Sequence, residues 1–416
     1  MGTLTEEIFS YKLGRRVQQG ETVVVEVDHV MSHDTTTPLA IEAFHKLADQ
    51  TGGRVFDRSR AHLIFDHIIP AATIQAATLH RKTREFAREQ GLEILQQGIC
   101  HQVMPEMGFI TPGSIIVGAD SHSCSYGAFG AFGTGMGSTD IAVAYATGKA
   151  WFRVPFTINV YLTGTLQPGV FAKDVTLEMV RRIGVDGANY RALEFTGELV
   201  ESFSISERFT FCNMAIEMGG KAGLVAADEK TRAWLHGRTE REYPMLKAEN
   251  PQYEQIFEID ASHLTPLVAC PPDVNNVVPV DQASSIKLDQ LFLGTCTNGR
   301  LDDLEVAAKI LKGRRVHPET RMVIIPASRE IQLEALRRGY IETFIEAGVS
   351  VGTPGCGPCI GRHFGVLAPG ERALTTMNRN FTGRMGDPTA EIYLGSPATV
   401  AASAITGYIT DPREFL

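Results

Sequence analysis

Residues 355–363 read GCGPCIGRH, and together with GTCTN at residues 294–298 this stretch decides the fold. Both segments place Cys in backbone rich in Gly and Pro, which turns sharply and lets the chain pass close to a bulky group. Cys296, Cys356 and Cys359 can therefore converge on one point. In a chain with no sign of secretion, three converging thiolates indicate a metal ion or an iron–sulfur cluster.

Two other kinds of cysteine site compete with a cluster at this motif. Cys-x-x-Cys also occurs in thiol redox proteins and in zinc sites. A zinc knuckle needs a fourth Cys or a nearby second pair, which the spacing here does not offer. A thioredoxin-like motif follows the first strand of its domain, whereas this one comes late and relies on Cys296 far upstream. A cluster is favoured, and a zinc hydrolase is the poorer alternative.

Composition and charge limit the possible partners of this chain. Its 416 residues predict two or three domains, and 44% hydrophobic with 21% charged residues is ordinary for a globular protein. A net charge of −9 does not indicate the positive surface that binds nucleic acid or an anionic membrane. We expect neither as a partner. A small anionic substrate must then be held by a few local Arg residues.

The remaining cysteines and the N-terminus predict a reducing, cytoplasmic location. The seven Cys are odd in number and widely scattered, unlike a disulfide framework. Residues 1–16 lack the apolar core of a signal peptide, and no apolar run is long enough to span a bilayer. The four Cys outside the motif are interpreted as structural thiols: Cys100, Cys124, Cys212 and Cys270.

Polar sites follow predicted strands repeatedly in the first 125 residues. They are His33, Asp66-His67, His101 and Asp120-Ser121-His122. Each alone is read most simply as a helix cap or a solvated side chain. The carboxyl ends of parallel strands meet at one edge of a sheet, where ligands gather in α/β folds. The repetition therefore predicts one pocket at that edge.

Two more familiar site types are rejected for this region. Asp120, Ser121 and His122 are adjacent, so on an extended strand they point to opposite faces and cannot form a hydrolase relay. The Gly-rich run at residues 127–137 lacks the G-x-G-x-x-G spacing of a nucleotide site. We expect that run to pack backbone closely.

The rest of the chain predicts further α/β structure. A helix is expected over residues 138–151, and the spacing of Asn213 and Glu217 predicts that they share one helix face. Residues 271–285, rich in Pro, Asn, Asp and Ser, indicate a linker. Alternating strands and helices from residue 286 predict a second unit with a mostly parallel sheet.

The motifs GTCTNGR, GCGPCIGRH and NRNFTGR (residues 378–384) resemble those of the aconitase superfamily of [4Fe–4S] hydro-lyases. The resemblance covers nearly the whole chain, and is strongest to the large subunits of 3-isopropylmalate dehydratases, with homoaconitase large subunits next. It implies α/β/α units with mostly parallel sheets and no C-terminal swivel domain. The implied regions are 1–285, with two similar-sized subdomains divided near 125–155, and a cluster-binding domain at 286–416.

The resemblance also implies roles for individual residues. Cys296, Cys356 and Cys359 would hold one [4Fe–4S] cluster per subunit and leave one iron open. The implied catalytic residues are Asp66, His67, His101, Asp120, His122 and Glu217. The implied substrate-binding residues are His33, Ser121, Arg379 and Arg384, and the implied cluster surroundings are Asn213, Asn298 and Asn378.

The resemblance further implies a split active site. In single-chain members the base is a Ser on a further C-terminal domain, whereas this sequence stops at Leu416. A small subunit carrying the swivel domain is therefore expected to complete the site. The implied activity is isomerisation of 2- and 3-isopropylmalate in leucine synthesis, with homocitrate in lysine synthesis or a methyl-malate as alternatives. RNA binding, known for some aconitases, is disfavoured by the acidic charge.

Overall fold

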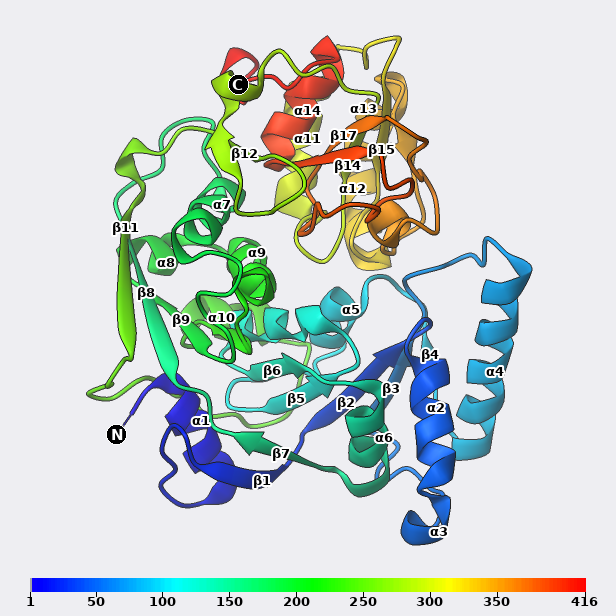
Figure 1. Cartoon of the computed structure of the whole chain (residues 1–416), viewed down its shortest axis with the longest axis vertical. Coiled ribbons are helices and arrows are strands. Elements are labelled where there is room, and N and C mark those ends of the chain that lie inside the picture. Colours follow the sequence, from blue (N-terminus) through cyan, green and yellow to red (C-terminus); the bar gives the residue numbers. More distant parts are fainter. Residues whose placement is uncertain (1) are drawn as a thin grey trace.

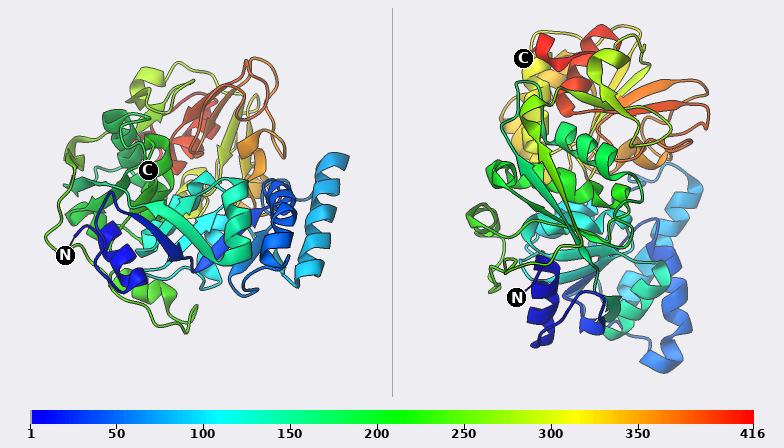
Figure 2. Two further views of the ribbon diagram at one scale, coloured as in Figure 1. Left: turned by 60° about the horizontal axis from the view of Figure 1, so that its bottom comes forward. Right: turned by 60° about the vertical axis from the view of Figure 1, so that its left-hand side comes forward.

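The computed structural model describes residues 2–416, and within them three main sheets follow one another along the chain. Figures 1 and 2 show the N-terminal part (blue to cyan) at the bottom and the C-terminal part (yellow to red) at the top. The middle of the chain (green) lies between them on one side. The predicted α/β class with mainly parallel sheets is confirmed.

The first sheet carries the strand ends that the sequence singled out. Its order is β4 (Ile94–Leu95), β3 (Ala61–Ile64), β2 (His29–His33), β5 (Ile115–Gly118) and β6 (Phe132–Gly135), with every neighbouring pair parallel. Every residue of β3 and β5 is buried, as parallel strands covered on both faces require. Beside the sheet lie α2 (Thr37–Lys46), α4 (Ile74–Gln90) and α6 (Ser138–Thr147) (Figure 1).

The second sheet lies in the middle of the chain. Its parallel strands are β10 (Ala222–Leu224), β9 (Ala192–Thr196), β8 (Thr157–Thr163) and β11 (Gln255–Asp260). The helices of this region are α7 (Ala172–Ile183), α8 (Glu198–Ser202), α9 (Ile205–Met214) and α10 (Glu229–Leu235). The start of α9 is fixed by Ser204, whose hydroxyl accepts the N–H of Glu207 while the Glu207 carboxylate accepts the N–H of Ser204.

The helix predicted over residues 138–151 is shorter than expected. It ends at Gly148, whose φ of 69° caps it in the left-handed region that Gly adopts readily. The next five residues form β7 (Lys149–Arg153), which pairs antiparallel with β1 (Thr22–Glu26). The prediction was wrong there because a partner strand more than 120 residues away decides the conformation.

The third sheet contains the Cys loops. Its order is β13 (Val277–Pro279), β12 (Leu267–Ala269), β18 (Glu391–Leu394), β17 (Arg372–Thr375), β14 (Gln290–Leu293), β15 (Arg321–Ile324) and β16 (Ser350–Val351). Pairs from β18 to β16 are parallel, while β12 and β13 add an antiparallel edge. Its helices are α11 (Leu301–Leu311), α12 (Arg329–Arg337), α13 (Tyr340–Glu346) and α14 (Pro397–Thr406). The linker predicted at 271–285 thus contains a strand of this sheet.

The three sheets share one apolar core. Ile116 of β5, Val160 of β8 and Phe292 of β14 belong to a single cluster of buried residues. Burial of this shared apolar surface, a favourable term for folding, fixes the sheets against one another. Among the helices of residues 2–416, none combines the length and the apolar character needed to cross a bilayer.

The Gly-rich run packs backbone against backbone, as predicted. A Cβ added to Gly127, in the 3₁₀ segment η1 (Ser121–Phe129), would lie 1.6 Å from the carbonyl oxygen of Gly223 in β10. A Cβ on Gly133 would lie 2.2 Å from the carbonyl oxygen of Ser123. These close contacts hold η1, which follows Asp120, tightly between the first and second sheets.

Candidate active site

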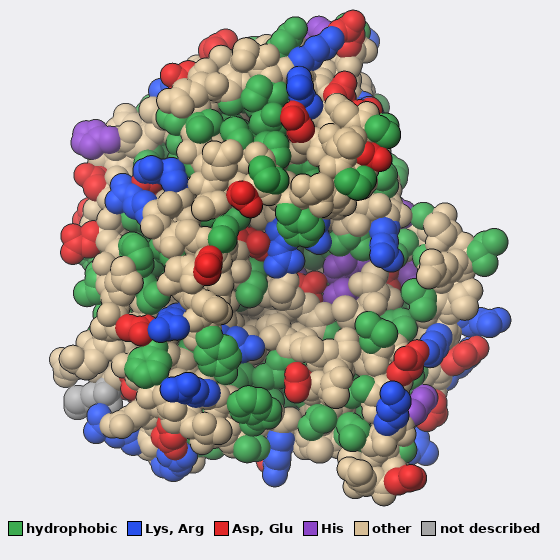
Figure 3. Space-filling view, in the orientation of Figure 1, with side chains coloured by type: hydrophobic (Ala, Val, Ile, Leu, Met, Phe, Trp, Pro, Cys, Tyr) green, Lys and Arg blue, Asp and Glu red, His purple; other side chains and the backbone are tan. Residues whose placement is uncertain are grey.

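One cavity of about 250 Å³ gathers side chains from both halves of the chain. Figure 3 shows a hollow near the middle of this face, with His and basic side chains gathered around it. The predicted site residues that line the cavity are His33, His67, His101, Asp120, Ser121, His122, Cys296, Cys356, Cys359, Arg379 and Arg384. Other predicted residues, Asp66, Glu217, Asn213 and Asn378, lie behind this wall and bond to residues that form it or to one another.

The first sheet brings its polar groups together at its carboxyl edge. His33 ends β2, Asp66 and His67 follow β3, and Asp120 follows β5. His101 lies in the short helix α5 (Cys100–Glu106), which follows β4. Because these strands are parallel neighbours, the side chains at their ends meet at one place.

Asp120 is the centre of the imidazole network. Its Oδ1 lies 2.9 Å from His101 Nε2 and accepts the backbone N–H of His122 at 2.7 Å. Its Oδ2 lies 3.3 Å from His33 Nε2 and 3.6 Å from His67 Nε2. Burial alone would raise the pKa of Asp120, but His101 and the other imidazoles outweigh it and hold this pKa well below the usual range. Asp120 is therefore ionised and can orient water as a hydrogen-bond acceptor.

Asp66 and His67 form a buried acid–imidazole pair. His67 Nδ1 lies 2.7 Å from Asp66 Oδ1, and its ring stacks on that of His33 with centroids 3.8 Å apart. Burial would lower the pKa of His67, but the Asp66 carboxylate outweighs burial and raises it to about 10. His67 is thus protonated at neutral pH. Its Nε2 lies 3.6 Å from Asp120 Oδ2, and both residues line the cavity.

Asp34, which the sequence interpretation missed, holds the Asp66-His67 turn in place. Its carboxylate accepts the N–H of His67 at 3.0 Å and of Ile68 at 2.7 Å, and lies 3.2 Å from His80 Nε2. The only sequence signal was its position directly after His33. The four side chains His33, Asp34, Asp66 and His67 place metal-ligand atoms within 4.8 Å of one another, but these atoms are already engaged in hydrogen bonds and in the acid–imidazole pair.

The three motif cysteines converge on the same cavity. Cys296 follows β14, while Cys356 and Cys359 bracket the start of the 3₁₀ turn η5 (Gly357–Ile360), and all three are buried. Burial raises the pKa of Cys296 to about 12, and the neighbouring Cys359 adds to this. Burial, Asp66 and the other two thiols raise the pKa of Cys356. Each of these thiols makes ionisation of its neighbour less favourable. A bound metal deprotonates the thiols that coordinate it, so this arrangement suits a shared cationic centre.

Hydrogen-bond donors point at two of these sulfur atoms. Asn378 Nδ2 lies 3.5 Å from Cys296 Sγ, and Arg384 Nη2 lies 3.4 Å from Cys359 Sγ. Arg384 Nε is buried with no partner among the described residues. Donors aimed at sulfur, together with a spare buried N–H, fit an iron–sulfur cluster, whose sulfurs accept such bonds. The residues present therefore fit the group that the motifs predicted.

The three Asn residues near the cysteines differ in their contacts. Asn213 Oδ1 accepts Asn378 Nδ2 at 2.9 Å and Thr297 Oγ1 at 3.1 Å, which ties α9 to the loop after β17 and to the Cys296 loop. Asn298 Nδ2 instead donates to Asp303 Oδ1 at 2.9 Å. Asn213 and Asn378 therefore contact the Cys296 loop through Thr297 and the Cys296 sulfur, whereas the Asn298 side chain bonds to Asp303 at the start of α11.

Glu217 connects an imidazole with an arginine. Its Oε1 lies 2.9 Å from His122 Nε2 and 2.8 Å from Arg379 Nε, and Arg379 Nη2 donates to Ser121 Oγ at 3.1 Å. Burial would raise the pKa of Glu217, but His122 and Arg379 hold it below the ordinary value. The shared helix face predicted for Asn213 and Glu217 is wrong, because α9 ends at Met214 and Glu217 lies in a 3₁₀ turn.

Cys100 also lines the cavity, although the sequence indicated only a structural thiol. Its backbone N–H donates to Asp66 Oδ2 at 2.7 Å. Its position directly before His101 was the available signal. The other three cysteines outside the motif, Cys124, Cys212 and Cys270, do not line this cavity.

Comparisons with known proteins identify the family of the chain. The profile of the aconitase family (aconitate hydratase) matches residues 6–287 and 281–407. The probable methanogen homoaconitase large subunit of Methanothermobacter thermautotrophicus is 52% identical over 417 residues, covering 99% of this chain and 97% of that one. The 3-isopropylmalate dehydratase large subunit of a Thermoanaerobacter species is 49% identical over 417 residues, covering 99% of each.

A solved structure supports the fold independently. The holo-form of aconitase X from Thermococcus kodakaraensis matches with a TM-score of 0.51 over 91% of this chain and 89% of that chain, at 12% identity. At that identity the likeness concerns the fold alone. The family profile and the full-length relatives confirm the resemblance first seen in the three motifs, and the chain belongs to the aconitase family.

Proposed function

We propose that this chain is the large, catalytic subunit of a [4Fe–4S] hydro-lyase that isomerises 2-isopropylmalate and 3-isopropylmalate by dehydration and rehydration. The observation that carries the proposal is the meeting of three buried cysteines with the Asp66-His67 pair and Asp120 in one cavity. Removal of water from a hydroxy acid needs an acid for the leaving hydroxyl, groups that handle water, and cations for the carboxylates.

The cysteines would hold the cluster and leave one position open. Cys296, Cys356 and Cys359 are the ligands, with Asn378 and Arg384 donating toward two of their sulfurs. When bound, a cluster with an iron free of protein ligands supplies a Lewis acid for a hydroxyl and a carboxylate. Three protein ligands are consistent with that open position.

The residues of the first sheet would move the protons. His67, protonated at neutral pH and oriented by Asp66, is placed to protonate the departing hydroxyl. Asp120, ionised and held by His101, is placed to orient the water. His122 and Glu217 extend this network toward Arg379.

The arginines would bind the substrate carboxylates. Arg379 and Arg384 both line the cavity and present planar guanidinium groups, which match a carboxylate with two parallel hydrogen bonds. Ser121, bonded to Arg379, and His33, at the end of β2, complete this polar wall. The fit is to a small di- or tricarboxylic acid.

A second chain would complete the site. The relatives at 49–52% identity are named large subunits, and that name implies a small-subunit partner. We propose a small subunit that carries the catalytic base and the residues that read the substrate side chain. We place the enzyme in the cytoplasm, where the cluster cysteines stay reduced.

Homoaconitase activity is the second candidate, and one observation favours it. The relative that is 52% identical is named a probable homoaconitase large subunit, whereas those named for 3-isopropylmalate lie at 48–50%. Both readings use the same cavity and differ in the acid it accepts. The pathway would then be lysine rather than leucine synthesis.

One anaerobic experiment separates these readings. The chain is reconstituted with iron and sulfide, and enoate absorbance is followed with 3-isopropylmalate and with homocitrate, each with and without a candidate small subunit. Turnover of 3-isopropylmalate only with the partner is expected. Preference for homocitrate would change the assigned substrate and leave the proposed mechanism as it is. Substantial turnover by the chain alone would overturn the split site, and a colourless protein holding zinc would overturn the cluster.

A further inference from the structure

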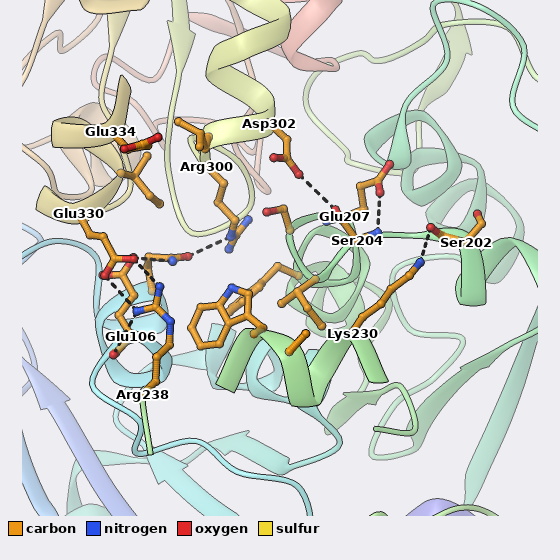
Figure 4. Close-up of a pocket in the computed structure, with 18 residues that line it drawn as sticks. Glu106, Ser202, Ser204, Glu207, Lys230, Arg238, Arg300, Asp302, Glu330 and Glu334 are labelled. Atoms are coloured by element: carbon orange, nitrogen blue, oxygen red, sulfur yellow. Dashed lines mark hydrogen bonds and ion pairs between the residues drawn. The ribbon is translucent and has the colours of Figure 1, made fainter. Parts of the chain in front are cut away.

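A buried arginine stands directly behind the loop that carries Cys296. Arg300 is 3% exposed and lines a second cavity, of about 640 Å³, which shares no lining residue with the active-site cavity. Figure 4 shows its side chain between the α11 end of the loop and α5, with a dashed contact toward α5. The sequence interpretation assigned it no role.

The guanidinium of Arg300 bonds to three acceptors at once. Nη2 donates to the carbonyl oxygen of Cys296 at 2.7 Å, and Nη1 donates to that of Thr297 at 2.9 Å. Nε donates to Gln102 Oε1 at 3.0 Å, and the group lies 4.0 Å from the ring centroid of Phe209. Bonds from a charged donor are the stronger kind, and the aromatic face adds a cation–π contact.

The loop that these bonds hold does not adopt an ordinary conformation. Thr295, next to Cys296, has a φ of 71°, in the left-handed region that a β-branched residue rarely adopts. Such a residue persists only when its surroundings fix it. Asp303 fixes the loop at its far end by accepting the N–H groups of Gly299 and Arg300, and the Arg300 side chain fixes the Cys296 end.

The third bond reaches the other half of the active site. Gln102 follows His101 in α5 and is itself fixed by donating to Glu106 Oε1 at 2.8 Å. One guanidinium therefore joins the loop of a proposed cluster ligand, on the third sheet, to the helix of His101, on the first.

The cavity itself does not point to a ligand. The charged side chains on its wall are bonded to protein groups: Arg238 pairs with Glu330, Lys230 donates to the carbonyl oxygens that end α8, and Asp302 accepts Ser204. Burial lowers the pKa of Arg300 to about 10, so its charge remains at neutral pH. Its donors are engaged by the loop and by Gln102.

We propose that Arg300 is a positioning residue that holds the Cys296 loop in its ligating conformation and sets it against the His101 helix. The inference rests on the proposed function for the role of Cys296 as a ligand, but not for the loop geometry. Arg300 touches neither the substrate site nor the sulfur atoms, and acts through the Cys296 and Thr297 carbonyl groups.

The test compares Arg300→Met, Arg300→Lys and Arg238→Met in the full chain. Arg238 lines the same cavity and stacks on Trp234, but does not bond to the Cys296 loop, so it is the matched control. The first readout needs no cluster: the alkylation rate of each cysteine by iodoacetamide in the apo chain, followed by peptide mass spectrometry. The second is iron and acid-labile sulfide per chain after anaerobic reconstitution.

Arg300→Met should raise the alkylation rate of Cys296 by about tenfold while leaving Cys356 and Cys359 within about twofold, because only the Cys296 loop loses its bonds. Sulfide retention should fall in parallel. Arg300→Lys, which keeps a charged donor, should recover part of both, and Arg238→Met should match the wild type.

Three results would overturn the proposal: an unchanged Cys296 rate in Arg300→Met, an equal rise at all three cysteines with early thermal unfolding, or the same selective rise in Arg238→Met. If the wild-type chain takes up no iron or sulfide, the proposed function fails while the alkylation result still decides the role of Arg300.

Discussion

The backbone N–H of Cys356 donates to the carbonyl oxygen of Asp66 at 2.8 Å, and Cys356 Sγ lies 3.9 Å from Asp66 Oδ2. This contact joins residues 290 positions apart, on loops of the third and first sheets. The loop that carries two proposed cluster ligands therefore docks on the strand end that carries the proposed acid. One hydrogen bond thus links the positions of the Cys356 loop and of the Asp66-His67 turn.

Asp66→Asn should remove the acid function of His67. Against the lowering effect of burial, Asp66 makes the largest contribution among the carboxylates that raise the pKa of His67 to about 10, and Asp34 and Asp120 add to it, so loss of the Asp66 charge should lower this pKa. We expect kcat to fall by about 10² to 10³ at pH 7 and its alkaline limb to move to lower pH. The measurement is kcat between about pH 6 and 11, a range that includes the wild-type pKa of about 10. The exposed Asp49→Asn is the control, and an unmoved alkaline limb in Asp66→Asn would contradict the assignment.

Cys356→Ala should abolish stable cluster binding. Two thiolates and no third ligand cannot hold a cubane that requires at least three. Iron and acid-labile sulfide per chain, measured after anaerobic reconstitution and desalting, should drop to near background. Cys270→Ala is the matched control, since Cys270 is only half-buried and lies outside the cavity. Full iron and sulfide in Cys356→Ala would mean that Cys356 is no ligand.

Arg379→Lys should weaken substrate binding. The planar fork of Arg379 already holds Glu217 and Ser121 and can present further N–H groups to a carboxylate, which a single ammonium cannot do. KM should rise by about tenfold to a hundredfold, equivalent to one lost charge-assisted bond of about 1.5–3 kcal/mol. Arg362→Lys, at an exposed position of the Cys loop, should leave KM unchanged. An equal KM in the two variants would show that Arg379 does not bind the substrate.

Gly127→Ala should destabilise the fold through a backbone clash. Its Cβ would lie 1.6 Å from the carbonyl oxygen of Gly223, which cannot yield without moving η1 away from β10. We expect a loss of about 3 kcal/mol in the free energy of unfolding, measured with urea on the apo chain. Gly137→Ala is the control, because its φ of −64° and open surroundings accept a Cβ, at a cost below about 1 kcal/mol. Equal effects would contradict the packing role.

His62→Gln should reduce the loss of folding stability that occurs as the pH falls below about 6.5. His62 is buried against His29, with ring nitrogens 2.8 Å apart, and burial lowers its pKa to about 3. A depressed folded pKa means that the neutral side chain stabilises fully above its unfolded value of about 6.5, and that stability falls as the pH drops toward 3. Wild type should therefore lose stability faster than His62→Gln between about pH 6.5 and 4, by up to about 1.4 kcal/mol per pH unit. The exposed His236→Gln should follow the wild type, and parallel curves for wild type and His62→Gln would contradict the prediction.

Much of the fold was accessible from local patterns. The alternation of strands and helices predicted from residue 286 is present, and β3 and β5 end just before Asp66 and Asp120, which were expected at strand ends. One error is non-local: residues 149–153 are a strand because β1, more than 120 residues away, pairs with them. Another is local: residues 277–279, placed in a linker, pair with the nearby β12 in an antiparallel hairpin. Pairing with a distant segment leaves no trace in the segment itself.

The candidate site divides in the same way. By itself, the sequence determined which residue types stand where: three cysteines in sharply turning backbone, and imidazoles and carboxylates at strand ends, because spacing and residue type suffice for these inferences. The roles of individual residues, Arg379 and Arg384 included, came from the family resemblance. Only the tertiary structure decided which groups touch. Asp34 beneath His67, Cys100 in the cavity wall and Arg300 behind Cys296 owe their roles to contacts between segments that the sequence does not bring together. The physical reason is that hydrogen bonds and buried charges act over a few ångströms in space, whatever the separation along the chain.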